Sequence, residues 1–294
     1  MSHPQPLDSN WLRANPLPQP ANDADKNARG RVLVIGGARN VPGGLLLTAE
    51  AALRSGAGKV RMATIESSVL ALGVAMPECA VFGLGERDDG EIADGCGEVL
   101  GKLLGRADAI VAGPAMGCER AAGKVADVLL EASECEAPLI LDAAALMSLP
   151  ARAKALTACG RPAILTPHIG EMAALLERDA DAIGADRAEA VREAATRYDA
   201  ICVLKGATSL IGTPAGELYA YAGGGVGLAT GGSGDVLAGI VAGLVARGAE
   251  PLGAALWAVW LHGEAGRRCA EQIGPLGFLA RELLAQVPSL MRAV

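Results

Sequence analysis

The chain has few aromatic residues, no extended basic run and a negative net charge, and these features exclude one large class of partner. Phe, Trp and Tyr together make up 3% of the 294 residues. Surfaces that stack nucleic-acid bases need more aromatic side chains than this. Acidic residues outnumber basic residues, 33 to 26, which gives a formal net charge of −7. We therefore expect no nucleic-acid partner.

The sequence also lacks closely spaced cysteines and long apolar segments. Its seven cysteines are widely separated, and none forms a Cys-x-x-Cys pair. This pattern argues against a disulfide framework or a zinc site and favours buried thiols in a reducing compartment. The N-terminal segment has no apolar core of the kind found in signal peptides. The stretch VLAGIVAGLVA at 236–246 is too short to span a bilayer. We expect a cytoplasmic protein with no membrane partner.

What the sequence does contain is a regular alternation of short apolar runs and helical patterns, beginning at residue 31. Apolar runs that end in small or polar residues are typical of buried parallel strands. Such strands are predicted at 31–37, 59–64, 109–113, 138–142, 162–166 and 200–206. Helices are predicted at 43–55, 118–132 and 184–198, with three more between the glycine-rich stretch and residue 290.

The fold class follows from this alternation. Residues 207–221 break it, because they resemble two strands around a Thr-Pro-Ala-Gly turn. We predict one α/β domain over residues 31–294, with a mostly parallel central sheet and helices on both faces. Residues 1–30 are rich in Pro, Asn and Asp and are predicted to form an extended N-terminal arm. In such sheets, ligands bind at the carboxyl ends of the strands.

The stretch LATGGSGDVLAG at 228–239 places glycines and a serine directly before an aspartate and an apolar helical pattern. Free backbone amides at a helix start, together with the helix dipole, form an anion site. Gly232, Ser233 and Gly234 are therefore candidates to hold a phosphate. Asp235 would then take a proton from the hydroxyl that attacks the phosphorus. An ordinary helix cap is the alternative role for Asp235. The chain contains neither a Walker-type P-loop nor a standard dinucleotide fingerprint.

Three further polar residues follow predicted strands. In ILTPHIGEM, Glu171 is three residues after His168, so the two would share one helix face. Glu171 is predicted to bind Mg²⁺ through water, with His168 contacting substrate, and capping of the helix start is the alternative role for Glu171. Asp142, at the end of LILD, suits either contact with a metal or substrate or the cap of the next helix.

Lys205 and Gly206 end the apolar run VLKG. An ammonium group at this edge of the sheet would meet nucleotide phosphates, and Gly206 would let them approach the backbone closely. A solvated lysine at the end of a strand is the alternative.

Seven stretches, taken in order, resemble the ADP/ATP-dependent NAD(P)H-hydrate dehydratases, a branch of the ribokinase-like superfamily. The likeness runs from about Lys26 to the C-terminus. The seven stretches are VLVIGGARNVPGGLLLTAEAALRSGAGKV, VAGPAMG, LILDAAAL, ILTPHIGEM, VLKGATSLI, GLATGGSGDVLAGIVAGLVARG and AALWAVWLHGEAG.

The resemblance implies a three-layer α/β/α ribokinase-like fold and a metabolite-repair activity. Members use ADP or ATP, with Mg²⁺, to phosphorylate the C6 hydroxyl of hydrated NADH or NADPH, and elimination of phosphate restores the reduced coenzyme. Bacterial members generally use ADP. Many are fused to an epimerase domain, for which this chain has no room, so dehydration of the S form is the expected activity. A homo-oligomer is also expected.

The resemblance also assigns roles to individual residues. Asp235 would act as the base beside the hydrated nicotinamide. Gly44, Gly113 and His168 would line the substrate. The nucleotide would be surrounded by Lys205, Gly206, Ala207, Thr208, Ser209 and Gly234.

The chain departs from the family pattern at four positions. It has Gly44 where alanine is usual and Ala115 where many members have glycine. It also has Ala144 in place of a second aspartate, and Gly225 in place of a common asparagine.

Two other functions fit the same motifs. The first is a kinase of a small alcohol, such as hydroxyethylthiazole or a sugar, whose reaction would stop after phosphoryl transfer. The second is a non-catalytic nucleotide sensor, which the presence of Asp235 and the glycine loop disfavours.

Overall fold

The computed structural model describes residues 3–21 and 23–294, and the strands of these residues form a single sheet. In chain order the strands are β1 (Gln5–Pro6), β2 (Arg31–Ile35), β3 (Lys59–Thr64), β4 (Ala80–Gly83), β5 (Ala109–Ala112), β6 (Leu139–Leu141), β7 (Ala163–Leu165), β8 (Ile201–Leu204), β9 (Thr208–Gly212) and β10 (Leu218–Ala222). Their order across the sheet is β1-β10-β9-β8-β7-β6-β5-β2-β3-β4.

The sheet is parallel apart from one strand. β9 runs antiparallel to both of its neighbours, β8 and β10, and all other pairs are parallel. β9 and β10 are the two strands predicted around the Thr-Pro-Ala-Gly turn. The mostly parallel sheet predicted from the apolar runs is therefore confirmed.

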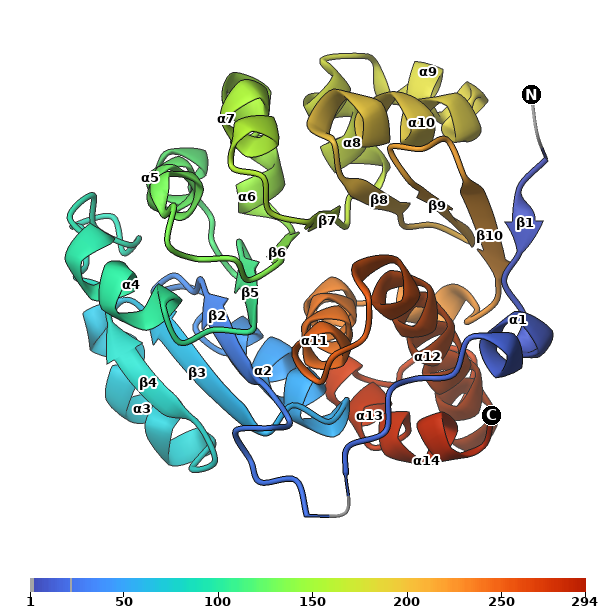
Figure 1. Cartoon of the computed structure of the whole chain (residues 1–294), viewed down its shortest axis with the longest axis horizontal. Helices are drawn as coiled ribbons and strands as arrows, with labels where there is room; N and C mark the ends of the chain where they lie inside the picture. Colours follow the sequence, from blue (N-terminus) through green and yellow to red (C-terminus); the bar gives the residue numbers. More distant parts are fainter. Residues whose placement is uncertain (1–2, 22) are drawn as a thin grey trace.

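Helices cover both faces of the sheet (Figure 1). They are α1 (Ser9–Ala14), α2 (Gly44–Arg54), α3 (Val69–Ala75), α4 (Gly97–Leu104), α5 (Glu119–Glu131), α6 (Ala144–Met147), α7 (Ala153–Ala158), α8 (Ile169–Leu176), α9 (Ala180–Ala185), α10 (Arg187–Tyr198), α11 (Ser233–Ala246), α12 (Pro251–Gln272), α13 (Ala280–Leu284) and α14 (Val287–Arg292). Short 3₁₀ turns lie at Glu66–Ser68, Pro150–Arg152 and Val226–Leu228.

Alternation along the strands divides the core into layers. In β2, Val32 and Val34 pack into the apolar cluster formed with α2, α11 and α12. Leu33 and Ile35 point to the opposite face, into the cluster formed with α4 and α5. Residues of α8 and α10 form a third cluster with β8–β10. Because successive strand residues point to opposite faces, strands that are apolar throughout need helices on both sides.

α11 lies at the centre of one layer and packs tightly on α2. A Cβ atom at Gly239 would lie 2.2 Å from the Thr48 carbonyl oxygen, and one at Gly243 would lie 2.4 Å from that of Ala52. Glycine at both positions therefore lets the two helices approach closely. Among the described residues, no helix combines the length and hydropathy needed to cross a membrane.

The N-terminal arm lies against the domain and contains elements that its composition did not reveal. β1 pairs with β10, and α1 follows it. Leu7, Leu12 and Leu17 are buried. Residues 1, 2 and 22 of the arm lie outside the described residues, and the boundary at residue 30 stays a prediction.

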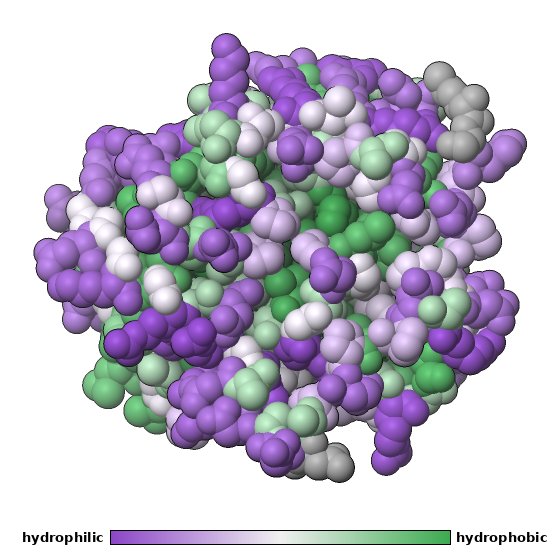
Figure 2. All heavy atoms as spheres, viewed as in Figure 1, coloured by the Kyte–Doolittle hydropathy of each residue, from purple (hydrophilic) through white to green (hydrophobic). Residues whose placement is uncertain are grey.

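Hydrophilic side chains cover most of the molecular face shown in Figure 2, and hydrophobic side chains are visible mainly in the recesses between them.

Candidate active site

The glycine-rich stretch begins α11, and the first turn of this helix lies beside Asp142 and Lys205, which follow β6 and β8. Gly232 is the N-cap residue, has a φ of +87°, and supplies no side-chain cap. Asp235 lies in the first helical turn and is not the cap. The capping role that the sequence allowed for Asp235 is therefore absent, and its carboxylate is available for other contacts.

Burial gives Asp235 an unusual proton affinity. Desolvation, reinforced by the nearby carboxylates of Asp142 and Glu171, raises the pKa of Asp235 from 3.8 to about 7, against the opposing effect of Lys205. A carboxylate with a pKa near neutrality is suited to take a proton from a substrate hydroxyl under physiological conditions.

Lys205 is held by carboxylates rather than exposed to solvent. Its Nζ lies 2.9 Å from Oδ1 of Asp142 and 3.6 Å from Oε2 of Glu171. Burial lowers the pKa of Lys205, but attraction to Asp142, Glu171 and Asp235 outweighs this effect, so the net shift is upward. The solvated alternative for Lys205 is therefore wrong. The lysine neutralises the acidic centre of the site.

Asp142 is almost completely buried, with 2% of its surface exposed. In addition to the Lys205 contact, its Oδ1 accepts a 2.8 Å hydrogen bond from the Thr166 hydroxyl. Asp142 therefore joins the ends of β6, β7 and β8 through its side chain. These contacts to Thr166 and Lys205 differ from the helix cap that the sequence left open.

His168 and Glu171 form a capping box at the start of α8. His168 Nδ1 accepts hydrogen bonds from the amides of Gly170 and Glu171, at 3.0 and 3.2 Å, and Glu171 Oε2 accepts one from the His168 amide at 2.7 Å. His168 thus precedes the helix, which corrects the prediction that the pair shares a helix face. The imidazole side chain is 59% exposed, and its Nε2 lies 3.5 Å from Glu171 Oε1, so a ligand that accepts a hydrogen bond from Nε2 would bind next to this carboxylate.

The glycines predicted to line the substrate occupy two different environments. Gly113 is buried, and a Cβ there would lie 1.9 Å from the Asp142 carbonyl oxygen, so this glycine lets the ends of β5 and β6 approach closely. Gly44 is closer to the proposed base: its Cβ would lie 3.4 Å from Oδ2 of Asp235. Their substrate contacts stay predictions.

The departures at positions 44 and 115 compensate each other. A Cβ at Gly44 would lie 2.6 Å from Cβ of Ala115, closer than two methyl groups can approach. Ala115 adopts a φ of +56°, which is unfavourable for a residue other than glycine. Only one of the two positions can carry a methyl group in this backbone.

We expect Gly44→Ala to destabilise the protein by about 1–3 kcal/mol through overpacking. Ala115→Gly removes the clashing methyl group and should restore stability in the double variant. The measurement is denaturant unfolding of all four proteins as a double-mutant cycle. Strictly additive effects would show that residues 44 and 115 do not interact.

The residues predicted to surround the nucleotide form the turn between β8 and β9. Lys205 directly follows β8, Gly206 and Ala207 are exposed, and Thr208 and Ser209 begin β9. A Cβ at Gly234 would lie 3.3 Å from Lys205 Nζ, so this turn faces the start of α11. Arg187 also reaches the turn, with Nη2 3.5 Å from the carbonyl oxygens of Leu204 and Lys205. No local pattern points to Arg187, because it reaches the turn from the separate helix α10.

His262 was also missed by sequence reasoning. Its Nε2 lies 2.9 Å from the hydroxyl of Ser233, at the first residue of α11. Burial lowers the pKa of His262 to about 4, so the ring is neutral at physiological pH. The pair fixes the Ser233 side chain at the candidate anion site. His262 lies inside the long helix α12, where its spacing resembles that of any other helical residue.

A family model described as NAD(P)H-hydrate dehydratase matches residues 32–289. The ADP-dependent (S)-NAD(P)H-hydrate dehydratase of Xanthomonas campestris pv. campestris is 44% identical over 280 residues, which cover 95% of this chain and 93% of that protein. A bifunctional NAD(P)H-hydrate repair enzyme from Moorella thermoacetica is 36% identical, and the match covers 97% of this chain and 53% of the enzyme. The chain thus spans about half the length of that relative.

Solved structures of related proteins also match the chain over nearly its whole length. An ADP/ATP-dependent NAD(P)H-hydrate dehydratase from Bacillus subtilis, co-crystallised with ATP and Mg²⁺, is 27% identical, with a TM-score of 0.82 and coverage of 100% of this chain and 99% of that one. A ribokinase-like superfamily protein from Enterococcus faecalis is 26% identical, with a TM-score of 0.83 and coverage of 98% and 95%. The expected ribokinase-like fold is confirmed.

Proposed function

The chain belongs to the NAD(P)H-hydrate dehydratase family, and on this basis we propose that it dehydrates the S form of hydrated NADH and NADPH in a reaction that consumes ADP or ATP. The observation that carries the proposal is Asp235, a carboxylate with a pKa near 7 in the first turn of α11. A base next to helix-start amides combines the two requirements of phosphoryl transfer to a hydroxyl.

In the proposed reaction, Asp235 accepts the proton of the C6 hydroxyl while the hydroxyl oxygen attacks the terminal phosphorus of the nucleotide. The bond from phosphorus to the departing nucleotide oxygen breaks, so ADP yields AMP. Phosphate then leaves the ring with the electrons of the C6–O bond. Loss of a proton from the neighbouring ring carbon restores the double bond of the reduced nicotinamide.

The surrounding residues take the roles that their positions favour. Amides at Gly232, Ser233 and Gly234 would hold the transferred phosphoryl group, because helix-start amides favour anions. The turn from Lys205 to Ser209 would receive the nucleotide. Gly44 leaves room for the acceptor beside Asp235, and His168 would donate to it from Nε2.

Mg²⁺ would enter with the nucleotide. Among the described residues, no group of three or more His, Cys, Asp or Glu side chains could hold a metal ion by itself. Asp142 and Glu171 both approach Lys205, and two carboxylates fit an ion that keeps most of its waters and binds substrate phosphates. The ion would supply neutralisation of phosphate charge. A cytoplasmic location and a homo-oligomeric state remain predictions.

Turnover of hydrated NADH and NADPH, with ADP and ATP in parallel, tests the proposal. We expect release of free phosphate together with recovery of the absorbance of the reduced coenzyme. A small-alcohol kinase would instead make a stable phosphoester. Absence of turnover with both nucleotides, combined with phosphorylation of a small alcohol, would replace the dehydratase proposal by the kinase.

A further inference from the structure

A cavity of about 410 Å³ opens between α2, α13 and the loop that precedes α11. Its volume lies within the range of small-molecule sites, about 300–1,000 Å³. It is formed by α2, α13, the end of α3 and the loop before α11. The lining residues that bear on ligand binding are Leu46, Leu47, Glu50, Ala75, Met76 and Arg281.

The cavity adjoins the candidate active site through Gly232. A Cβ at Gly232 would lie 2.4 Å from Cδ1 of Leu47, 3.3 Å from Cβ of Ala280 and 3.9 Å from Oδ2 of Asp235. Gly234 lies on the opposite side of the same helical turn and faces Lys205, because a Cβ at Gly234 would lie 3.3 Å from Lys205 Nζ. A ligand in the cavity would therefore reach Asp235 without entering the space beside Lys205.

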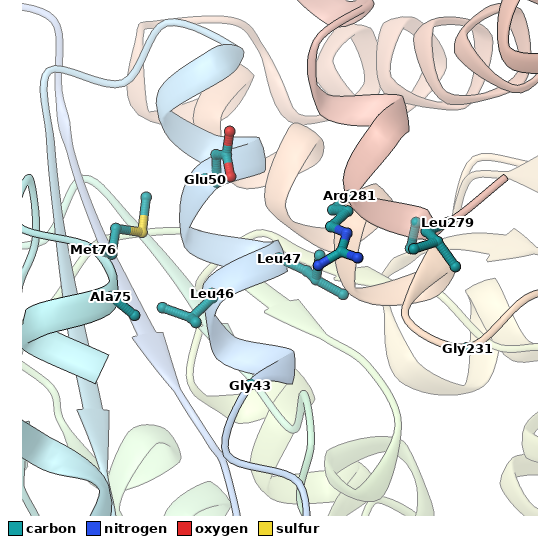
Figure 3. A pocket seen from close by; sticks show the side chains of 10 residues that line it. Gly43, Leu46, Leu47, Glu50, Ala75, Met76, Gly231, Leu279 and Arg281 are labelled. Carbon is teal, nitrogen blue, oxygen red and sulfur yellow. The ribbon is translucent and has the colours of Figure 1, made fainter. Parts of the chain in front are cut away.

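The lining of the cavity combines an apolar surface with one positively charged side chain, that of Arg281. In Figure 3, Leu46 points toward Ala75 and Met76, and Leu47 points toward Arg281. Arg281 is exposed, and within residues 3–21 and 23–294 its guanidinium group has no hydrogen-bond or ion-pair partner. Glu50 does not neutralise it, because Glu50 pairs with Arg54 at 3.1 Å. An apolar surface beside a free guanidinium suits a nucleotide, which has a flat base and an anionic phosphate.

From this geometry we infer that the cavity binds the adenosine-containing half of the dinucleotide, with Arg281 pairing to one of its phosphates. The inference rests on the proposed function, which puts the nicotinamide ring at Asp235. The rest of the dinucleotide must then leave the site, and the side beside Lys205 is taken by the second nucleotide. The phosphate is either the pyrophosphate, common to both coenzymes, or the 2′-phosphate, present only in NADPH.

Fluorescence titration of NADH and NADPH, the reaction products, into wild type and Arg281→Gln tests this site without requiring turnover. Loss of a hydrogen bond to a charged group predicts that Kd rises by about 10-fold or more. A rise for both coenzymes identifies the pyrophosphate, and a rise for NADPH alone identifies the 2′-phosphate. KM for the hydrated coenzyme should rise in parallel, with KM for ADP unchanged.

Arg292→Gln is the matched control, because Arg292 is exposed on the neighbouring helix α14 and does not line the cavity. Equal coenzyme affinity in wild type and Arg281→Gln, or an effect on ADP alone, would overturn the inference. The two proposals can fail separately. Coenzyme binding that depends on Arg281 in a protein without dehydratase activity would remove the proposed function and leave the binding site.

Discussion

Asp235→Asn is expected to slow the chemical step by about 10²–10⁴-fold, the usual effect of removing a general base. Asparagine has nearly the same size but cannot accept the proton of the attacking hydroxyl. Nucleotide binding should persist, because the helix-start amides and Lys205 are unchanged. The measurement is the single-turnover rate at saturating nucleotide. A rate within a few-fold of wild type would mean that Asp235 is not the base.

Stability provides the control for this variant. The pKa of Asp235 is raised in the folded protein, from 3.8 to about 7, so the folded state holds the proton more tightly than the unfolded state. Stability therefore decreases as pH rises through this window. Asparagine carries no charge, so Asp235→Asn should unfold at the same or a higher temperature than wild type at pH 8. Asp8→Asn, at the cap of α1, is a matched variant far from the site and should retain wild-type activity.

The same pKa predicts the pH dependence of the wild-type reaction. The base must be deprotonated to act, so the single-turnover rate should rise with pH and reach half of its maximum near pH 7. Asp235→Asn should lose this ascending limb. A limb that persists in the variant would assign the titration to another group.

The sequence predicted the central strands well because parallel strands buried on both faces are apolar throughout. β3 matches its predicted range of 59–64, and β2, β5, β6, β7 and β8 are each shorter than predicted by one to three residues. β4 was missed because it lies at the edge of the sheet. Its residues are partly exposed, so AVFG has no strong hydrophobic signal.

The sequence predicted many of the residues that form the candidate site, but it did not predict which of them contact each other. Strand-end residues were expected to converge, since parallel strands end at one edge. The Asp142–Lys205 contact joins residues 63 positions apart, and no local pattern encodes such a contact. The clash that couples Gly44 to Ala115 is likewise invisible without the backbone. His262 and Arg187 were missed for the same reason, because each reaches the site from a helix of ordinary pattern.

Removing the charge of Lys205 should lower the stability of the protein by a large amount. This expectation comes from the contact between Lys205 and Asp142, which the sequence alone does not reveal. The sequence by itself predicts only that the Lys205 ammonium group meets nucleotide phosphates. The structure pairs Lys205 with Asp142, which is 2% exposed. Leaving one partner of a buried pair without its counter-charge costs about 3–5 kcal/mol. We expect Lys205→Met, which keeps the apolar stem, to lose stability in this range in urea unfolding at pH 7.

A double variant separates the structural role of Lys205 from its proposed role in binding. Asp142→Asn with Lys205→Met removes both charges, so most of the lost stability should return. Nucleotide affinity should remain weak, because the ammonium group is still missing. Lys205 also lowers the pKa of Asp235, so Lys205→Met should move the half-maximal rate to a pH above 7. If Lys205→Met is as stable as wild type, solvent screens the ion pair between Lys205 and Asp142. If the double variant binds nucleotide as tightly as wild type, Lys205 has a structural role only.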